Sequence, residues 1–215
     1  MPALRPNAIR HRRQRGVSLV VVLLILIIVS LLGAGAAQMA LMGERTTRAD
    51  RDYQVAFQAA EAALSDALSE IEGPIDPSVT NSRLAIFTQG NKQGFIAGCN
   101  NGTATRGLCL PMPSSTSPTD KDVWYQVDFT DAGSTAKTVA YGTYTGRQMS
   151  YGGGGLQPAA LPRYIIEVED HTEPGMDASH PASKITMYRI TAVGFGPTQN
   201  ARVMLQAEYE NLRGQ

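Results

Sequence analysis

The hydrophobic positions of the chain follow three successive patterns, and the first is a continuous apolar run. From Val17 to Gly43 no residue is charged, and residues 19–29 are all aliphatic. A helix needs about 20 apolar residues to cross a hydrocarbon layer of roughly 30 Å. The run therefore predicts a transmembrane helix over residues 17–43.

The second pattern predicts that this helix continues as an amphipathic one over residues 44–72. No proline occurs between Asn7 and Gly73, and Gly73 followed by Pro74 is typical of a helix end. The predicted apolar stripe recurs every three or four residues: Tyr53, Phe57, Ala60, Leu64, Leu68 and Ile71. The predicted polar face consists of Asp50, Gln54, Glu61, Ser65, Asp66 and Glu72. Residues 17–72 would form one helix of roughly 84 Å.

The third pattern is strand-like alternation within a head of residues 73–215. Residues 73 to about 122 consist mainly of turn-forming residues, with one short element expected around residues 84–87. Five strands are expected after them, around residues 125–129, 139–141, 164–168, 185–195 and 203–209. The last two would form an antiparallel hairpin. The predicted fold class is α+β, with a long N-terminal helix packed on an antiparallel sheet.

Charge is distributed unevenly along the 215 residues. Nineteen basic and nineteen acidic residues cancel, but residues 1–16 contain five arginines and no acid, which leaves 14 basic against 19 acidic residues and a net charge of −5. The basic segment before the apolar run places the N-terminus in the cytoplasm and the head outside. The composition argues against disordered, collagen-like and polytopic membrane proteins, and the zero net charge against a nucleic-acid binder.

Three kinds of N-terminal segment fit this arrangement. A secretory signal peptide could be cleaved near Ala34-Gly35-Ala36, and a plain signal anchor would not be cleaved. The third possibility is cleavage at Gly16, between the basic segment and the apolar helix. Such a cut would remove a leader of residues 1–16 with its arginines and leave the helix on the mature protein. We prefer this third interpretation.

The segment from Arg13 to Leu19, Arg-Gln-Arg-Gly-Val-Ser-Leu, resembles a type IV prepilin signal. The resemblance implies that a prepilin peptidase cuts after Gly16 and methylates Val17. It also implies that the apolar helix packs in a bundle with the helices of other subunits through Leu19, Val20, Val21, Leu23, Leu24, Leu26 and Ile27. Major pilins usually carry a glutamate at the fifth mature position, where this chain has Val21.

Further segments narrow the resemblance to PilX-type minor pilins, which are related to GspK-type pseudopilins of type II secretion. They are the alanine-rich stretch 56–64, the Gly-Leu-Cys sequence at 107–109, and the closing segments 188–194 and 203–207. The resemblance implies an inner-membrane protein with a periplasmic head that later joins a type IV pilus and serves twitching motility. Its implied partners are prepilin peptidase, other minor pilins, the major pilin and a tip adhesin.

The absence of the carboxylate at Val21 leads to a hypothesis about position. A subunit without it need not receive the terminal amine of a neighbour, which favours a place at the tip of a priming complex. Alternatives are a type II secretion pseudopilin and, from a different class, a signal-anchored periplasmic binding protein or enzyme.

The two cysteines, Cys99 and Cys109, are interpreted as one structural disulfide in an exported head. A redox pair would favour a two-residue gap, and a metal site would need more ligands. No catalytic set is evident, the three histidines form no ligand pattern, and the glycines at 152–155 lack the Lys-Ser/Thr of a phosphate loop. We expect no enzyme activity, no cofactor, no metal and no nucleic-acid partner, with calcium in the head as a minor alternative.

Overall fold

The computed structural model describes residues 17–73, 78–88, 90–111, 122–172, 175, 184–198 and 200–210. The chain forms two compact units, Met1–Arg48 and Ala49–Gln215. The predicted leader, residues 1–16, lies outside the described residues. The first unit therefore consists, as described, of helix alone.

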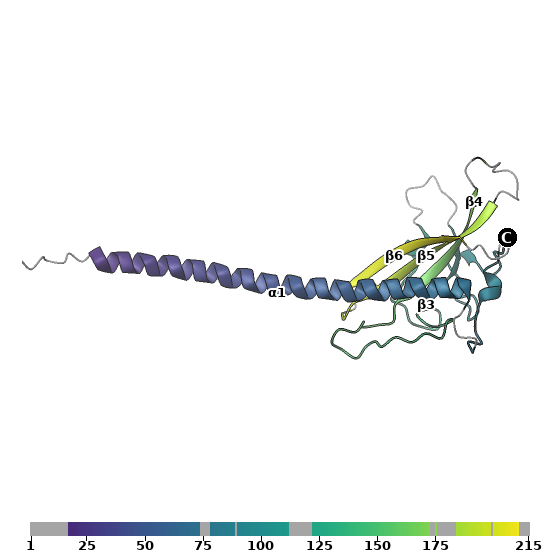
Figure 1. The fold of residues 1–215 in the computed structure, drawn as a ribbon, viewed down its shortest axis with the longest axis horizontal. Helices are drawn as coiled ribbons and strands as arrows, with labels where there is room; N and C mark the ends of the chain where they lie inside the picture. Colours follow the sequence, from purple (N-terminus) through teal and green to yellow (C-terminus); the bar gives the residue numbers. More distant parts are fainter. Residues whose placement is uncertain are drawn as a thin grey trace, which may run out of the picture. The chain divides into compact units, whose positions relative to one another are not determined.

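The long helix α1 spans Val17–Glu72, which confirms the predicted range (Figure 1). It contributes residues 17–48 to the first unit and residues 49–72 to the second. Gly73 follows it with a φ of 105°, in the left-handed region that glycine adopts readily and that commonly ends helices. The glycine stop read from the sequence is thus a real helix end.

The second unit is built on a six-stranded mixed sheet. Its strands are β1 (Ile96–Ala97), β2 (Leu108–Leu110), β3 (Val139–Ala140), β4 (Arg163–Thr172), β5 (Lys184–Phe195) and β6 (Arg202–Glu210). They lie in the order β1-β2-β4-β5-β6, and β3 also pairs with β4. The predicted hairpin is confirmed, since β5 and β6 pair antiparallel over nine register positions from Met187–Glu210 to Phe195–Arg202.

Two features of the head differ from the prediction. The sheet is mixed, because β1 pairs parallel with β2 and β2 pairs parallel with β4. The strand expected around residues 125–129 is wrong, since a short helix α2 (Val123–Gln126) occupies its first half. Val123 and Val127 are both buried and stand four residues apart, which is one helical turn. The expected short element near residue 84 is the 3₁₀ turn η1 (Leu84–Ile86).

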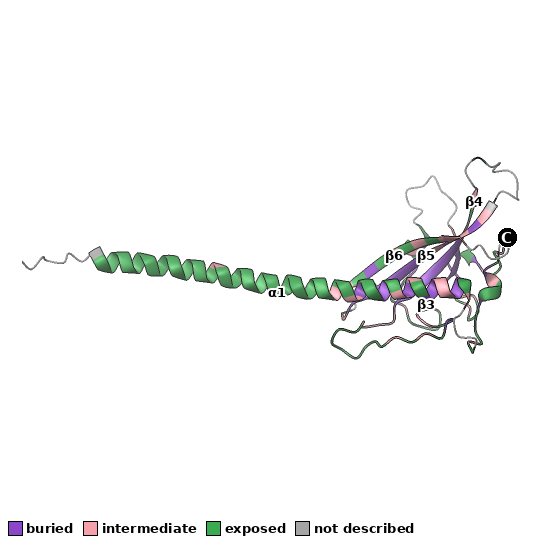
Figure 2. Ribbon diagram, in the orientation of Figure 1, coloured by how far each residue is buried: buried purple, intermediate pink, exposed green. Residues whose placement is uncertain are grey.

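The buried stripe of α1 is composed mainly of alanine, which corrects the predicted stripe. Tyr53 is 58% exposed and Phe57 36% exposed, whereas the buried apolar positions are Ala56, Ala59, Ala60, Ala63, Ala67 and Ile71. Figure 2 shows this buried stripe along the part of α1 that lies on β5 and β6. At Gly194 of β5 an added Cβ would lie 2.1 Å from the Ala56 carbonyl oxygen. The backbones approach so closely that only small side chains fit between them.

Candidate assembly surface

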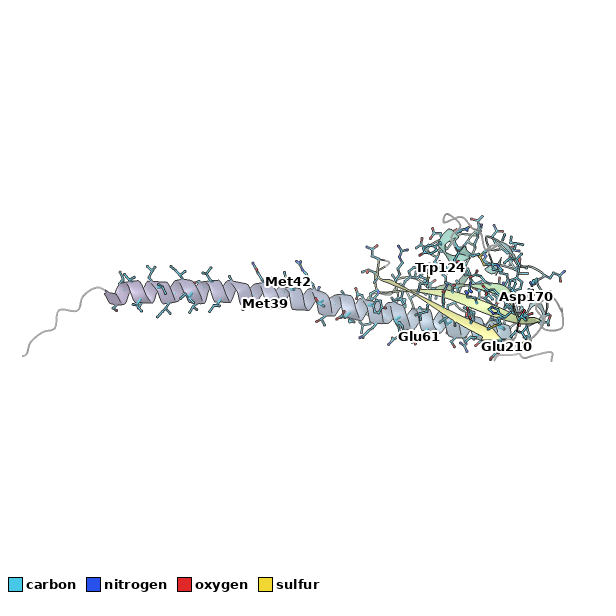
Figure 3. The ribbon with its side chains drawn as sticks, turned by 90° about the horizontal axis from the view of Figure 1, so that it is seen from above. Met39, Met42, Glu61, Trp124, Asp170 and Glu210 are labelled. Atoms are coloured by element: carbon cyan, nitrogen blue, oxygen red, sulfur yellow. A yellow bond between two sulfur atoms is a disulfide. The ribbon has the colours of Figure 1, made fainter. Side chains whose placement is uncertain are left out.

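The first unit presents an extended apolar surface along α1, in which Ser30 and Gln38 are the polar residues between Leu19 and Met42. Every large apolar side chain from Leu19 to Met42 is exposed, with exposed fractions between 47% and 76% (Figure 2). Figure 3 shows Met39 and Met42 extending from this part of the helix. Burying one such side chain is favourable by about 1.5–3 kcal/mol. A surface of this size needs either lipid or partner helices to cover it.

One helix within the described residues is long and apolar enough to cross a membrane, and its most apolar window has no buried residue. The residues predicted for a membrane or helix-bundle contact all lie in this helix and are at least half exposed: Leu19, Val20, Val21, Leu23, Leu24, Leu26 and Ile27. They lie on all sides of the helix because they are nearly consecutive. Val17 begins α1, and Gly16 lies outside the described residues.

The helix surface also contains small residues that leave room for a close neighbour. An added Cβ at Gly33, Gly35 or Gly43 would meet no atom within 4 Å. The helix is continuous through all three, so none of them breaks it here. Small residues on apolar helices let a second backbone approach closely. These glycines therefore suit helix–helix contact.

Charged side chains begin where the apolar run ends, at Glu44. Thr46 Oγ1 donates to the Met42 carbonyl oxygen at 3.0 Å, and Thr47 Oγ1 donates to that of Gly43 at 2.9 Å. In the same turns, Glu44 and Arg48 form an exposed ion pair. The threonine hydroxyls are thus satisfied within the helix itself, and the first acid after the apolar run is paired with a base four residues later. This is a suitable boundary between an apolar layer and water.

In the head, two acidic side chains of α1, Asp66 and Glu70, are directed inward. Glu70, 1% exposed, accepts hydrogen bonds from Arg83 Nε at 2.6 Å and from the Tyr164 hydroxyl, and it also pairs with Arg83 Nη2. Burial raises the pKa of Glu70, and the charge of Arg83 opposes that rise. Arg83 also donates to the Arg106 carbonyl oxygen at 2.6 Å and lies 3.7 Å from the centroid of the Tyr144 ring.

Asp66 extends this network one turn earlier on α1. Its carboxylate accepts hydrogen bonds from the Thr145 hydroxyl and, at 2.7 Å, from the Gly142 amide. Burial raises the pKa of Asp66, although both hydrogen bonds act in the opposite direction. The sequence placed Asp66 on the solvent face, which is wrong, since it is fully buried. Asp66 and Glu70 instead attach the loops of the head to α1.

The predicted disulfide is present between Cys99 and Cys109, next to the parallel strands β1 and β2. Cys99 has a φ of 66°, so the loop turns sharply at its first cysteine. Inside the loop, Thr103 accepts a hydrogen bond from the Tyr144 hydroxyl at 2.6 Å, and Arg106 accepts from Arg83. The covalent loop is therefore joined to the buried network around Glu70.

The acids near residue 128 are engaged locally. Asp128 accepts from the Thr130 amide at 2.8 Å and from its hydroxyl at 2.6 Å, and these bonds lower the pKa of Asp128. Asp131 accepts from the Gly133 amide at 2.8 Å. Within the described ranges, no three His, Cys, Asp or Glu side chains form a group that could hold a metal. Asp120 and His180 lie outside those ranges.

Two family models match the chain. The model described as PilX N-terminal matches residues 15–65, and the one described as Type IV pilus assembly protein PilX C-term matches residues 105–211. Together they cover more than two thirds of the chain. The chain belongs to the PilX family. No curated protein and no solved structure matches it.

Membership of the PilX family gives the exposed apolar segment a context. The chain is a type IV pilus assembly protein of the minor-pilin class, and its N-terminal match includes nearly all of that segment. The C-terminal match includes the end of the disulfide loop and the strands β2 to β6. Both the apolar helix and the head thus belong to one recognised kind of pilus protein.

Proposed function

We propose that this protein is a non-enzymatic minor pilin that primes type IV pilus assembly and occupies a position near the pilus tip. The observation that carries the proposal is the exposed apolar segment of α1, from Leu19 to Met42, in a chain of the PilX family. Before assembly this segment spans the inner membrane, with the N-terminus cytoplasmic and the head periplasmic. On assembly it packs against the equivalent helices of other minor pilins and the major pilin.

Cleavage of the leader prepares the apolar segment to move from the membrane into a bundle of helices. Prepilin peptidase cuts after Gly16, so residues 1–16 leave with five arginines and the mature chain begins at Val17. The proposed mature parts are residues 17–43 for the membrane and bundle, 44–72 for the amphipathic half of the helix, and 73–215 for the head. A charged leader at the end of a helix would oppose entry into an apolar bundle.

Val21 supports the position near the tip. A carboxylate at this position could neutralise the terminal amine of an adjacent subunit, and an unpaired amine in an apolar bundle is costly. Val21 is an aliphatic side chain, 50% exposed, and cannot accept that charge. A subunit with nothing above it has no such amine to receive, and its outer face is free to hold a tip adhesin.

The processing step is tested by intact mass and N-terminal sequencing of the membrane form. We expect a methylated Val17 as the first residue. A Gly16→Val variant should keep its leader and fail to enter pili, while the head stays folded. A mature protein that starts near Ala37 would contradict the proposal, because most of the apolar segment would then be lost.

The tip position is tested by gold labelling of the head in assembled pili. We expect labels at one end of each pilus, and an even distribution along the shaft would contradict the tip position. A Val21→Glu variant supplies the missing carboxylate. We expect it to appear within the shaft more often than the wild type, with Val22→Glu, one residue away, as the matched control that does not.

A further inference from the structure

A small cavity in the head contains a buried arginine without an acidic partner. The cavity has a volume of about 140 Å³ and lies where β4 begins and β5 ends. Its walls are largely apolar and are formed by Phe129, Tyr151, Ala160, Leu161 and Phe195. Arg163, the first residue of β4, supplies the charged group of the lining and is only 7% exposed.

Arg163 has hydrogen-bond donors left over. Its Nε donates to Thr138 Oγ1 at 2.5 Å, and its Nη2 donates to the Thr138 carbonyl oxygen at 2.9 Å. A guanidinium carries five N–H groups, so Thr138 accepts two and three remain. These three have no hydrogen-bond partner among the described residues. Two of them, one on Nη1 and one on Nη2, lie side by side at the end of the guanidinium, next to the Nε–Nη2 edge that Thr138 occupies.

The charge of Arg163 is also uncompensated by direct contact. No carboxylate of the described residues forms an ion pair with it. Asp131 attracts it from a distance but accepts its own hydrogen bond from the Gly133 amide. Burial lowers the pKa of Arg163, and the nearby charge of Arg106 lowers it further. A buried charge of this kind is costly unless an anion pairs with it.

We propose that this cavity binds a small free carboxylic acid that carries one aromatic ring or one branched aliphatic group. The carboxylate would accept two parallel N–H bonds from the free end of Arg163, the geometry in which arginine binds carboxylates most strongly. The apolar group would lie among Phe129, Leu161 and Phe195. A cavity of about 150 Å³ holds a single benzene ring, so the available space suits one ring and little more.

The rim of the cavity offers a way to close it without touching its base. Ala132 lines the cavity and is itself exposed, so a larger side chain there reaches into the opening without disturbing the core. Ala104 is also exposed but does not line the cavity, and it provides a matched control for the same substitution. Comparing the same substitution at these two positions distinguishes the loss of cavity space from a general effect on the head.

The test uses benzoate as the probe, with the full chain in lipid nanodiscs and binding followed by saturation-transfer NMR. We expect saturable binding to the wild type and to Ala104→Phe with the same Kd. Binding to Arg163→Gln and to Ala132→Phe should be weaker by about tenfold or more, because the charge-assisted contact or the space is lost. Benzamide, the neutral isostere, should bind the wild type weaker by a similar factor.

Three results would overturn the proposal. They are absence of saturable benzoate binding by the wild type, equal affinity of benzamide and benzoate, and an unchanged Kd in Ala132→Phe. N-acetylphenylalanine resembles the C-terminal residue of a protein chain, so comparing its binding with that of benzoate distinguishes a small free acid from a chain terminus as the ligand. We expect it to bind more weakly than benzoate, because its backbone exceeds the cavity, and tighter binding would assign the site to a chain terminus instead. If Arg163→Gln does not fold, the comparison of benzoate with benzamide on the wild type and the affinity of Ala132→Phe for benzoate still test the proposal.

Discussion

The two parts of α1 differ in the size of their apolar side chains and in what covers them. From Leu19 to Met42 the helix carries large aliphatic side chains, all exposed. From Ala56 to Ala67 its buried apolar positions are alanines, and the large residues Tyr53 and Phe57 point away from the core. Most of the large apolar side chains of α1 thus lie on a surface that the chain does not cover itself, and Ile71, near the end of the helix, is a buried exception.

This difference shows how one helix can serve two kinds of packing. Within the head, the backbone of α1 packs closely on β5 at Gly194. Further along the helix, Asp66 and Glu70 form hydrogen bonds with residues of the loops. In the first unit, nothing lies within 4 Å of the positions where Cβ atoms would be added at the glycines. Substitutions in the head should therefore change its folding, and those in the first unit should change assembly.

The largest expected effect comes from Glu70→Ala. It leaves Arg83, whose side chain is 3% exposed, with an uncompensated charge, and removing one partner of a buried pair costs about 3–5 kcal/mol. We expect the free energy of unfolding of the head to fall by that amount, measured by denaturation of the full chain in detergent. Trp124, the single tryptophan, reports on the head by its fluorescence.

The matched control for this variant is Glu61→Ala on the same helix. Glu61 is exposed (Figure 3), so its loss should change the free energy of unfolding by less than about 0.5 kcal/mol. Equal effects of the two substitutions would show that the buried network contributes no special stability, and the contrast between the two parts of α1 would lose its main support.

The close approach at Gly194 gives the second effect. In Gly194→Ala the added Cβ would lie 2.1 Å from the Ala56 carbonyl oxygen and 2.2 Å from the Ala60 nitrogen, so α1 must move away from β5. Overpacking of this kind costs typically 1–3 kcal/mol, and we expect about 3 kcal/mol because both neighbours are backbone atoms. The same denaturation experiment measures it.

Gly33→Ala is the counterpart in the first unit. Its Cβ meets nothing within 4 Å, so the stability of the head should stay within about 0.5 kcal/mol of the wild type. A defect in pilus assembly with an unchanged head would support the use of this surface for helix contacts. If Gly194→Ala were as harmless to the head as Gly33→Ala, the close approach of α1 to β5 would be refuted.

The sequence predicted those elements whose signals are local. The end of α1 at Gly73, the hairpin of β5 and β6, and the disulfide follow from a glycine-proline stop, from alternation on both sides of a turn, and from two cysteines in an exported head. Each of these signals needs only neighbouring residues, and the exported context of the cysteines follows from the apolar run.

The errors arose where tertiary contacts decide the outcome. Large residues at helical spacing suggested that Tyr53 and Phe57 are buried, but Gly194 leaves room only for alanine. Asp66 looked like a solvent-facing acid because its partners, Thr145 and Gly142, are more than seventy residues away. Strands β1 and β2 have two and three residues, too few to show a period. The cavity at Arg163 likewise depends on loops that only the fold brings together.

The smallest effect is a change of the head's free energy of unfolding with pH. We expect it in the head, which contains a buried titratable carboxyl group, and not in the apolar segment of α1. Glu167 in β4 is 2% exposed, and its Oε2 is buried without a hydrogen-bond partner among the described residues. Burial raises the pKa of Glu167 from 4.5 to about 7. The folded head therefore holds this proton more tightly than the unfolded chain. The contribution of Glu167 to the free energy of unfolding is therefore most favourable below pH 4.5. This contribution is lost as the pH rises through 7.

We expect Glu167 to reduce the free energy of unfolding by about 2 kcal/mol between pH 5 and pH 8. Glu167→Gln, which keeps the shape without the charge, should remove this loss and be the more stable protein at pH 8. Urea denaturation of both proteins at several pH values measures it. Residues 17–43 contain no charged side chain, so contacts made by the side chains of that segment should not follow the titration of Glu167. A wild-type head whose stability rises from pH 5 to pH 8 relative to Glu167→Gln would show that Arg189 stabilises the ionised carboxylate more than burial opposes it.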